Sequence, residues 1–383
     1  MPRPWLTQEL MERARALVQG GAGRHSLMDA LNLSEEKARA LLHAVKQTGA
    51  PAVEPDPIVP PTSELATAIS DSIRALPALQ VKRVVRKVDP ELDEEDVILH
   101  VSDCHVGSLV SATQTGGLGH YDFEVFTERM ERLCSGVAKI LRYTPNPVKR
   151  VHLVLGGDII DGSTIFRGQQ RQIDLPVVQQ VIHAYEAFVR LILDLRAMFD
   201  EVVVSGVPGN HARIGLKGEL APNDNLDYLM MHFLRERFQL SEIAGVRFNL
   251  PETWWMLLEA QGWRFLVAHG DEFRSWLRIP FYGALGFKAR MREVLKQAFK
   301  KVSGESVDFD YVMVAHHHEP ASFSDIFMNG SFVGGSEFSL KRLQAGGLPF
   351  QRILGVHRNI GVSWDRKLIL ADRRELPEPT IYQ

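Results

Sequence analysis

A strand and the turn after it set the interpretation of this chain; they read Leu153-Val154-Leu155-Gly156-Gly157-Asp158-Ile159-Ile160-Asp161-Gly162. The aliphatic run through Leu155 predicts a buried strand, because such residues favour strands and the two glycines stop the run. Asp158 then lies at the carboxyl end of the strand, where α/β folds bind their ligands. A buried ionised carboxylate is costly unless it is paired or bound to a cation. A lone Gly-Gly-Asp is usually only a turn, so a site here needs support from the rest of the chain.

Four other apolar strands also end in side chains that can bind metals. The five segments are Asp103-Cys104-His105-Val106-Gly107, Gly157-Asp158, Gly209-Asn210-His211, His269-Gly270-Asp271 and Ala315-His316-His317-His318. Their Asp, His and Asn donors suit manganese, iron or zinc and require no thiolate. Each segment alone has an ordinary explanation, as a turn, a polar core residue or a polar cluster. Five unrelated turns in this order are much harder to explain, so we predict one metal centre at these strand ends.

The composition is that of an ordinary soluble globular protein. The 383 residues are 45% hydrophobic and 24% charged, with a formal net charge of −3, which suits one large domain and a small one. This charge gives the whole protein no attraction to nucleic acid, so such binding would need local patches. The two cysteines, Cys104 and Cys134, fit a reducing cytoplasm better than a disulfide framework. With no signal-like segment and no run of about 18 apolar residues, we expect a cytoplasmic protein without membrane contact.

The first part of the chain predicts a small helical module over residues 1–48. Its run LMDALNLSEEKARALLHAV resembles a helix-turn-helix, in which a short turn joins a support helix to a recognition helix. Residues 1–50 contain seven basic and five acidic side chains, so the module is only mildly cationic. A DNA reader and a three-helix unit that docks a protein are equally good explanations.

A linker and a basic segment fill residues 49–89. Five prolines in residues 49–63 predict an extended, semi-rigid linker. The run KRVVRK (82–87) is followed at once by the acidic run ELDEED. Opposite charges side by side are typical of a solvated strand and turn, although this edge could also face phosphate.

Apolar strands alternate with helical patterns in the main domain, which we place over residues 90–383. Predicted strands cover 97–101, 151–155, 202–204, 254–259, 263–268 and 310–314, and predicted helices cover 122–142, 176–198 and 224–238. The order starts as strand, helix, strand and later becomes β-rich, so we expect an α/β fold with a mixed sheet or two packed sheets flanked by helices. The turn at 328–331 and the closing strand at 361–370 are expected to serve the second sheet rather than chemistry.

The motif series D-x-H, G-D, G-N-H, H-G and a final G-H-x-H resembles the calcineurin-like metallophosphoesterase superfamily, from about residue 97 to at least residue 318. The resemblance implies a four-layer β-sandwich flanked by helices, with two metal ions at the strand ends. It places the first metal on Asp103, His105 and His318, the second on Asn210, His269 and His316, and Asp158 between them. His211 would lie beside the leaving-group oxygen as the general acid.

The match departs from the family pattern at two positions. Ala315 replaces the glycine before the last histidines, which matters only if the backbone there needs a positive φ. Ala212 replaces the acidic residue that usually follows the G-N-H histidine, which leaves open what orients His211. His317 falls at a variable position and receives no role.

The implied chemistry is hydrolysis of a phosphoester. Two divalent ions about 3.5–4 Å apart lower the pKa of a shared water and clamp the phosphoryl oxygens while the bridging hydroxide attacks in line. Protonation of the departing alkoxide by His211 typically contributes about 10²–10⁴-fold in rate. The expected cofactor is a pair of divalent ions, manganese first, with iron or zinc as alternatives.

DNA is the substrate that the sequence favours. The G-D-x-x-D-G form of the second motif and the run GGLGHYDFEVFTERMERL (116–133) resemble the nuclease side of the superfamily, including SbcD-type enzymes. His120 in that run is a predicted substrate contact, although an exposed loop histidine would look the same. Residues 270–302 hold five aromatic side chains: Phe273, Trp276, Phe281, Tyr282 and Phe287. Aromatic rings beside cations suit a strand of nucleic acid.

The same insert ends in a predicted basic helix, FKARMREVLKQAFKKV (287–302), with six basic residues and one acidic residue. Phe287, Met291, Leu295, Ala298 and Val302 would form its apolar face. The lysines would be mostly exposed, and an ordinary packed helix with solvated lysines fits equally well. Predicted DNA contacts are Lys296 and Lys300 here and Arg213 and Lys217 beside G-N-H.

Two alternative functions stay open. The first is a phosphomonoesterase that acts on a phosphoprotein or a nucleotide. The second is a non-catalytic DNA-binding or scaffold subunit, as some relatives have become; it ranks last because every ligand position here is filled. A protein partner could bind through the N-terminal module.

Overall fold

The computed structural model describes residues 8–19, 24–31, 33–35, 37–38, 40–41, 71, 73–81, 84, 89–215, 217–275, 279–304, 306–318, 321–336 and 347–371. The chain divides into two compact units, Met1–Asp71 and Ser72–Gln383. The predicted proline-rich linker and most of the basic run at 82–87 lie outside the described residues. No helix in the described part of the chain is both long and apolar enough to cross a membrane.

The N-terminal unit contains two described helices, α1 (Gln8–Gln19) and α2 (Arg24–Leu31). Their apolar positions recur at helical spacing, and Ala14 and Leu27 are fully buried together with Ala38 and Leu41. The third predicted helix is described only in part. The helix-turn-helix interpretation therefore stays a prediction.

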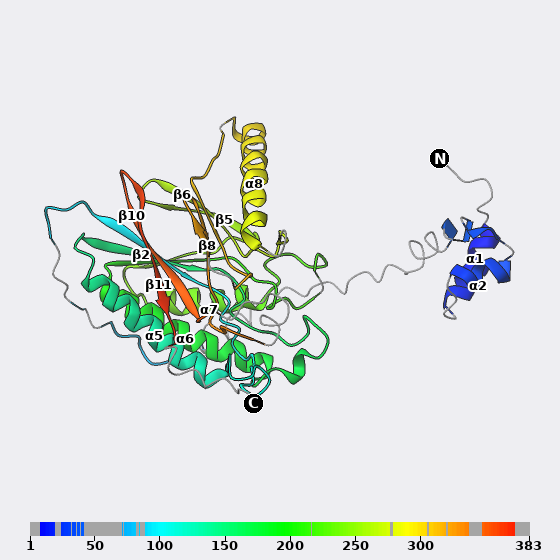
Figure 1. Ribbon diagram of the computed structural model, residues 1–383, viewed down its shortest axis with the longest axis horizontal. Helices are drawn as coiled ribbons and strands as arrows, with labels where there is room; N and C mark the ends of the chain where they lie inside the picture. The colour runs from blue at the N-terminus through cyan, green and yellow to red at the C-terminus, as the bar shows by residue number, and fades with distance from the viewer. Residues whose placement is uncertain are drawn as a thin grey trace, which may run out of the picture. The chain divides into compact units, whose positions relative to one another are not determined.

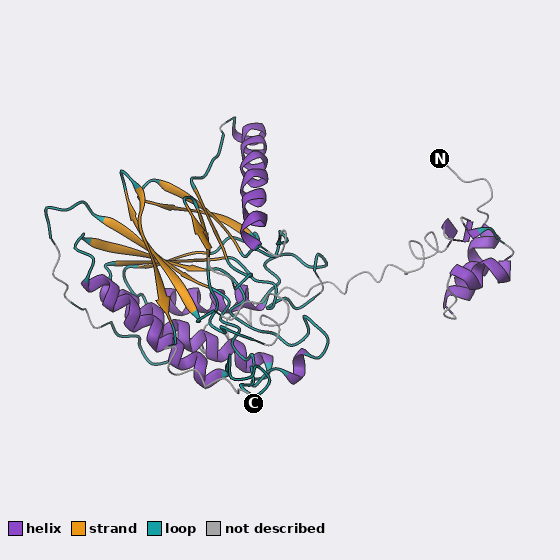
Figure 2. Ribbon diagram, in the orientation of Figure 1, coloured by secondary structure: helices purple, strands orange, loops and turns teal. Residues whose placement is uncertain are grey.

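The large unit contains two sheets, drawn in orange in Figure 2. The six-stranded sheet has the order β11-β10-β1-β2-β3-β4, and the five-stranded sheet has the order β5-β6-β7-β9-β8. The strands of the first are β1 (Glu95–Val101), β2 (Val148–Leu155), β3 (Glu201–Gly206), β4 (Val246–Asn249), β10 (Phe350–His357) and β11 (Gly361–Ile369). Those of the second are β5 (Trp255–Ala260), β6 (Trp263–Ala268), β7 (Tyr311–Val314), β8 (Ala321–Phe323) and β9 (Ile326–Met328).

Parallel pairing brings the ends of the motif-bearing strands to one edge of each sheet. In the first sheet Val101 of β1 pairs with Leu155 of β2, which pairs in turn with Gly206 of β3. In the second sheet β6 and β7 are also parallel neighbours. Segments that follow these strands must therefore emerge side by side, which is where α/β folds bind ligands.

Alternation along the strands builds four layers. Val97 and Leu99 of β1 belong to a core shared with helices, whereas Ile98 points to the other sheet and packs with Phe265 of β6 and Met313 of β7. This is the period of two that a strand imposes. Helices α5 (Phe123–Arg142), α6 (Val177–Met198) and α7 (Leu226–Leu240) cover the first sheet, and α8 (Pro280–Ser303) packs on the second. Figure 1 shows α5 and α6 along one side of the sandwich and α8 on the other, which confirms the predicted two-sheet fold flanked by helices.

Local sequence signals place the helices. The side chain of Asp122 accepts a hydrogen bond from Val125 N at the start of α5, and Asn225 does the same for Asp227 N at the start of α7. Each such cap contributes about 1 kcal/mol to stability. Pro280 occupies the first turn of α8, and Gly304 ends that helix in the left-handed conformation with a φ of 76°.

Three details differ from the prediction. Strand β4 has no counterpart in it, because Val246–Asn249 is a short edge strand whose residues are alternately half-buried and exposed. The closing strand β11 pairs with β10 in the first sheet rather than in the second. Ala298 and Val302 do not join the apolar face of α8: Ala298 is exposed, and the side chain of Val302 is 87% exposed.

Candidate metal centre

All seven predicted metal ligands meet where the two sheets end together. Asp103 and His105 follow β1, Asp158 follows β2 and Asn210 follows β3, whereas His269 follows β6 and the two last histidines, His316 and His318, follow β7. Each sheet thus supplies part of the donor set. The distances given below fall into two groups that share Asp158.

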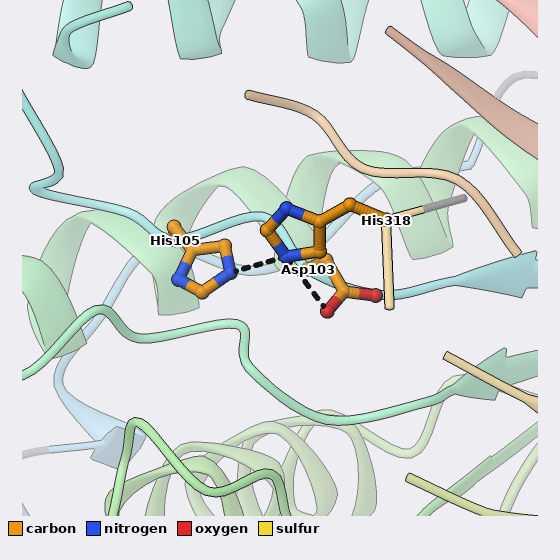
Figure 3. A group of neighbouring side chains, drawn as sticks. All are labelled: Asp103, His105 and His318. Carbon is orange, nitrogen blue, oxygen red and sulfur yellow. Dashed lines mark hydrogen bonds and ion pairs between the residues drawn. The ribbon is translucent and has the colours of Figure 1, made fainter. Parts of the chain in front are cut away.

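The first group contains Asp103, His105 and His318 (Figure 3). The Nε2 atom of His318 lies 3.0 Å from Nε2 of His105 and 3.3 Å from Oδ1 of Asp103. One ligand atom from each of the three lies within 4.8 Å of the others. Two ring nitrogens and a carboxylate oxygen that face one another in this way can share one cation.

The second group is centred on His269. Its Nε2 atom lies 3.1 Å from Oδ2 of Asp158 and 3.2 Å from Oδ1 of Asn210. His316 completes this group, because its ligand atom lies within 4.8 Å of those of Asp158 and His269. The same Oδ2 atom of Asp158 lies 4.0 Å from Nε2 of His105. Asp158 therefore stands between the two groups, as the predicted bridging position requires.

Backbone strain is concentrated at these residues. Among the described residues with side chains, seven have a positive φ, and five of them are predicted ligands: Asp103, His105, Asp158, His316 and His318. A non-glycine residue in this region is strained by about 1–3 kcal/mol and persists only where its surroundings hold it. Ala315 is not among them, so the missing glycine of the last motif costs nothing in backbone freedom.

Two glycines allow the second and third motifs to approach each other. Gly157 has a φ of 86°, and a Cβ atom there would lie 2.6 Å from the backbone nitrogen of Gly209. A Cβ atom on Gly209 would lie 2.0 Å from the backbone nitrogen of Asp158. Both contacts are far too short, so larger residues would push the Asp158 and Asn210 segments apart.

Hydrogen bonds to the far ring nitrogens orient the histidines. His105 donates from Nδ1 to Oδ1 of Asp161 at 2.9 Å, and His269 donates from Nδ1 to the carbonyl oxygen of Gly156 at 2.8 Å. These partners assign a proton to Nδ1 in each ring, so Nε2 is the nitrogen that each ring presents to the site. Metal-binding histidines in proteins are held in this way.

Asp103 and Asp158 are fully buried, yet both are held in the ionised form. Burial opposes ionisation, but the hydrogen bond and charge of His318 outweigh it and lower the pKa of Asp103 to about 2. At Asp158 the charges of His269 and His211 do the same and lower the pKa well below its usual value. The backbone N–H groups of His316 and His211 also donate to these carboxylates. The site therefore has two carboxylate charges ready for cations.

Asp161, the second aspartate of the G-D-x-x-D-G motif, is a site residue to which the sequence analysis assigned no role. Its carboxylate contacts both His105 Nδ1, at 2.9 Å, and His211 Nδ1, at 3.2 Å. Burial opposes its ionisation, but the hydrogen bonds from His105 and His211 lower its pKa to about 2. Asp161 thus supplies the acidic partner for His211 that Ala212 cannot. The available signal was its position three residues after Asp158, in the same turn.

His211 lies beside the first group and holds a proton. Its ring is 4.5 Å from that of His105, edge to face. Burial favours the neutral ring, but the charge of Asp158 and the hydrogen bond to Asp161 outweigh it and raise the pKa of His211 to about 9. A protonated imidazole at this point can donate to an oxygen bound in the site.

A buried aspartate behind the site fixes its loops. Asp227 accepts hydrogen bonds from the backbone N–H groups of Ile160 and Gly209, each at 3.0 Å. Burial and the charge of Asp158 raise the pKa of Asp227 to about 7. The second and third motifs are therefore tied to one side chain at the start of α7.

The predicted substrate contacts beside the site are partly neutralised. Oδ2 of Asp271 lies 3.6 Å from Nη1 of Arg213 and 2.7 Å from Nζ of Lys217. His120 is half exposed and lies 3.2 Å from Oδ2 of Asp122. The contacts of these three residues with a substrate stay predictions.

Two of the five aromatic side chains predicted to contact DNA in the insert are core residues, whereas Tyr282 is 44% exposed. Phe273 and Phe287 are buried, and their rings pack 5.3 Å apart in the core under α8, so they cannot stack on a base. Trp276 lies outside the described residues. Phe273 and Phe287 instead fill the space between α8 and the second sheet.

The cations of α8 fall into two sets. Lys288 pairs with Asp325, and Arg292 and Lys296 both pair with Asp308. Arg290 is exposed, as are Lys300 and Lys301 in the last turn. None of these three forms an ion pair with a described residue, so they are available for phosphate.

The residues present fit two divalent ions. Metal binding needs neutral imidazoles and ionised carboxylates. Burial lowers the pKa of His105, and burial together with the charge of His269 lowers that of His316 to about 3. At His269 burial opposes protonation, but Asp158 outweighs it and raises the pKa. A cation in place of that proton would neutralise the same carboxylate.

Three solved structures resemble this chain at low sequence identity. Vacuolar protein sorting 29 from Cryptosporidium parvum is 11% identical, with 69% of this chain and 86% of that chain covered and a TM-score of 0.28. Vps29 from Entamoeba histolytica, complexed with zinc, is 12% identical, with 71% and 99% covered and a TM-score of 0.28. Phosphopantetheinyl hydrolase from Mycobacterium tuberculosis is 13% identical, with 75% and 100% covered and a TM-score of 0.26. Nothing about function follows from scores this low.

Comparison with protein families identifies the chain more clearly than comparison with solved structures. No curated protein matches the chain. Residues 97–355, well over half of the 383 residues, match the calcineurin-like phosphoesterase family. This range contains both donor groups together with Asp161 and His211. The chain belongs to the calcineurin-like phosphoesterase family.

Proposed function

We propose that this protein hydrolyses DNA phosphodiesters with the help of two divalent metal ions, manganese first and iron or zinc as alternatives. The observation that supports hydrolysis is the meeting of seven donor side chains in two groups that share Asp158. We assign Asp103, His105 and His318 to one ion and Asn210, His269 and His316 to the other. When bound, the ions would supply Lewis acidity that activates water and offsets phosphoryl charge.

His211 is the proposed general acid. Asp161 holds its Nδ1 atom, which leaves the other ring nitrogen for the leaving-group oxygen. During hydrolysis the oxygen of water bonds to phosphorus, the bond from phosphorus to the leaving oxygen breaks, and that oxygen takes the proton of His211. The water loses one proton to the solvent, from which His211 is protonated again. Gln169, whose Nε2 lies 3.5 Å from His211 Nδ1, donates to the same Asp161 that holds His211.

Positive charge along α8 supports DNA over a small substrate. The helix has 24 residues and is thus about 36 Å long, and Lys300 and Lys301 are exposed at its far end. Each phosphate contact that is lost should reduce the salt dependence of binding by about one unit of slope. Replacing both lysines by glutamine should therefore flatten the slope of DNA affinity against salt by about two units; an unchanged slope would remove α8 from the interface.

The N-terminal unit and the cellular location complete the proposal. We assign residues 1–48 to recruitment, to DNA or to a protein partner, and residues 90–383 to catalysis, with 49–89 as the linker. The two free cysteines, Cys104 and Cys134, support a cytoplasmic location.

A side-by-side assay tests the substrate class. The full chain, loaded with manganese, is given a chromogenic diester, a chromogenic monoester and labelled DNA in single-stranded, double-stranded and hairpin forms. We expect cleavage of the diester and of DNA, with much slower hydrolysis of the monoester. Preference for the monoester with DNA left intact would instead make the protein a phosphomonoesterase.

Matched variants separate the enzyme from a scaffold. Asp158→Asn should abolish every activity, because it removes the shared ligand, whereas Asp194→Asn on the exposed face of α6 should act like the wild type. If the wild type binds metal and DNA but cleaves none of the substrates, the protein is a non-catalytic subunit.

A further inference from the structure

A polar cavity opens beside His211, outside the metal centre. Its volume is about 700 Å³, and all its lining residues come from one loop, residues 163–171, between Gly162 and α6. The loop contains a single 3₁₀ turn, Gln169–Arg171, that starts after Gly168, whose φ is 91°. We call this segment the 163–171 loop.

Gln169 ties the 163–171 loop to the catalytic residues. Its side chain is fully buried, and its Nε2 atom donates to the carbonyl oxygen of Asp161 at 2.8 Å and to Oδ2 of Asp161 at 3.1 Å. Its Oε1 atom accepts from Ile165 N at 2.8 Å. The carboxylate that orients His211 therefore also fixes the position of the loop.

The cavity lining offers an aromatic face and two cations. Phe166 is 46% exposed, and its ring centre lies 6.3 Å from that of His211. Arg167 and Arg171 are exposed, and neither forms an ion pair with any residue that the structure describes. Arg213 and Lys217, by contrast, share Asp271. Exposed rings stack on bases, and guanidinium groups bind phosphate in a bidentate manner.

We propose that the 163–171 loop binds the leaving nucleotide: its base packs on Phe166, and its next phosphate binds Arg167 and Arg171. This inference rests on the proposed function, since His211 marks the side of the scissile phosphate on which the leaving group departs. It narrows the substrate class to esters whose leaving group is a nucleotide that carries a further phosphate. A diester whose leaving group is a small neutral alcohol has no second phosphate for the two arginines to bind.

Three dinucleotides test this assignment with the manganese-loaded full chain: TpT, pTpT and TpTp. The products of TpT show which oxygen departs, because thymidine 5′-phosphate means that the 5′-side nucleoside leaves and thymidine 3′-phosphate means that the 3′-side nucleoside leaves. If the 5′-side nucleoside leaves, pTpT has its extra phosphate on the leaving nucleoside. If the 3′-side nucleoside leaves, TpTp does. We expect kcat/KM for that dinucleotide to exceed that for TpT by about tenfold or more, since one charge-assisted contact to phosphate is worth about this factor. For the dinucleotide whose extra phosphate lies on the other nucleoside, kcat/KM should exceed that for TpT by much less.

Variants of the loop should remove this preference. Arg167→Gln combined with Arg171→Gln should bring the kcat/KM ratio of the favoured dinucleotide to TpT close to one, and Phe166→Ala should raise KM for TpT. Arg190→Gln, on the exposed face of α6, is the matched control and should keep the wild-type ratio. Circular dichroism and turnover of a chromogenic diester show that each variant is folded.

The outcomes distinguish the two proposals. If the dinucleotides are cleaved but the double variant keeps the wild-type ratio, the loop assignment is wrong and DNA hydrolysis stands. If no dinucleotide is cleaved while a chromogenic monoester is, the nucleic-acid substrate is wrong and the loop assignment falls with it.

Discussion

Replacing Asp161 by asparagine tests whether one carboxylate orients two histidines of the site. Asp161 Oδ1 lies 2.9 Å from His105 Nδ1 and 3.2 Å from His211 Nδ1, and the side chain is only 6% exposed. Asparagine has nearly the same shape but no charge, and its NH₂ group must face either the two histidines at Oδ1 or Nε2 of Gln169, which donates to Oδ2. The substitution should therefore disturb a metal ligand and the general acid at once.

The expected size of the effect follows from these two contacts. Hydrogen bonds to charged groups contribute about 1.5–3 kcal/mol and neutral ones about 0.5–1.5 kcal/mol, so each bond to Asp161 should weaken by about 1–1.5 kcal/mol. Two weakened bonds lower kcat/KM by about 30–150-fold. Loss of a partner behind a metal-bound histidine typically costs 10–100-fold in affinity or activity, which agrees with this range.

The assay measures kcat/KM on a chromogenic diester at saturating manganese, together with metal binding by titration calorimetry. Asp161→Asn should bind the ion held by His105 more weakly and turn over slowly even when it is saturated. Asp174→Asn is the matched control, because that carboxylate accepts from Phe123 N and faces no histidine of the site. Full turnover and unchanged metal affinity in Asp161→Asn would refute the role given to this carboxylate.

Three further predictions follow from the site and the core. His211→Ala should keep both metal ions, by elemental analysis, but lose about 10²–10⁴-fold in kcat; a fully active variant would contradict the general-acid role. Manganese at about 100 times its dissociation constant should stabilise the folded protein by about 2.7 kcal/mol, seen as a rise in Tm that Asp158→Asn abolishes; an equal rise in the variant would place the metal elsewhere. Burial of Asp96 opposes ionisation, but the hydrogen bond and charge of His152 and the charge of Arg150 outweigh it and lower its pKa below 3.8. The ionised Asp96 should therefore stabilise the folded protein fully at neutral pH, and this stabilisation should fade as the pH falls below about 4. In urea unfolding, the free energies of unfolding of the wild type and Asp96→Asn should become equal below that pH. A difference between them that grows in acid would contradict the lowered pKa.

Strands, helices and the gathering of the candidate donor residues were predictable because each depends on a local pattern. The apolar run of β1 and the helical spacing in α6 are visible in single segments of sequence. The strand-end motifs identify donors that the parallel register then gathers at one edge. These are features that one stretch of chain encodes without help from its partners.

Other features depend on contacts between distant segments. The sequence alone does not distinguish an aromatic residue that stacks on a base from one that lies in the core. For Phe287 the packing of α8 on the second sheet decides between the two. Lys296 looks available until Asp308 is placed beside it. The role of Asp161 becomes visible only once His105 and His211, 106 residues apart in the numbering, face the same carboxylate.

The division of the donor set between the two sheets has a mechanical consequence. Each proposed ion would draw ligands from both layers, so the pair would act as a cross-link between halves that also meet through apolar contacts, such as those of Ile98 with Phe265 and Met313. Sliding one layer over the other by an ångström would distort both coordination shells together. Loosened packing between the layers should thus appear first as weakened metal binding, before any strand separates from its neighbours.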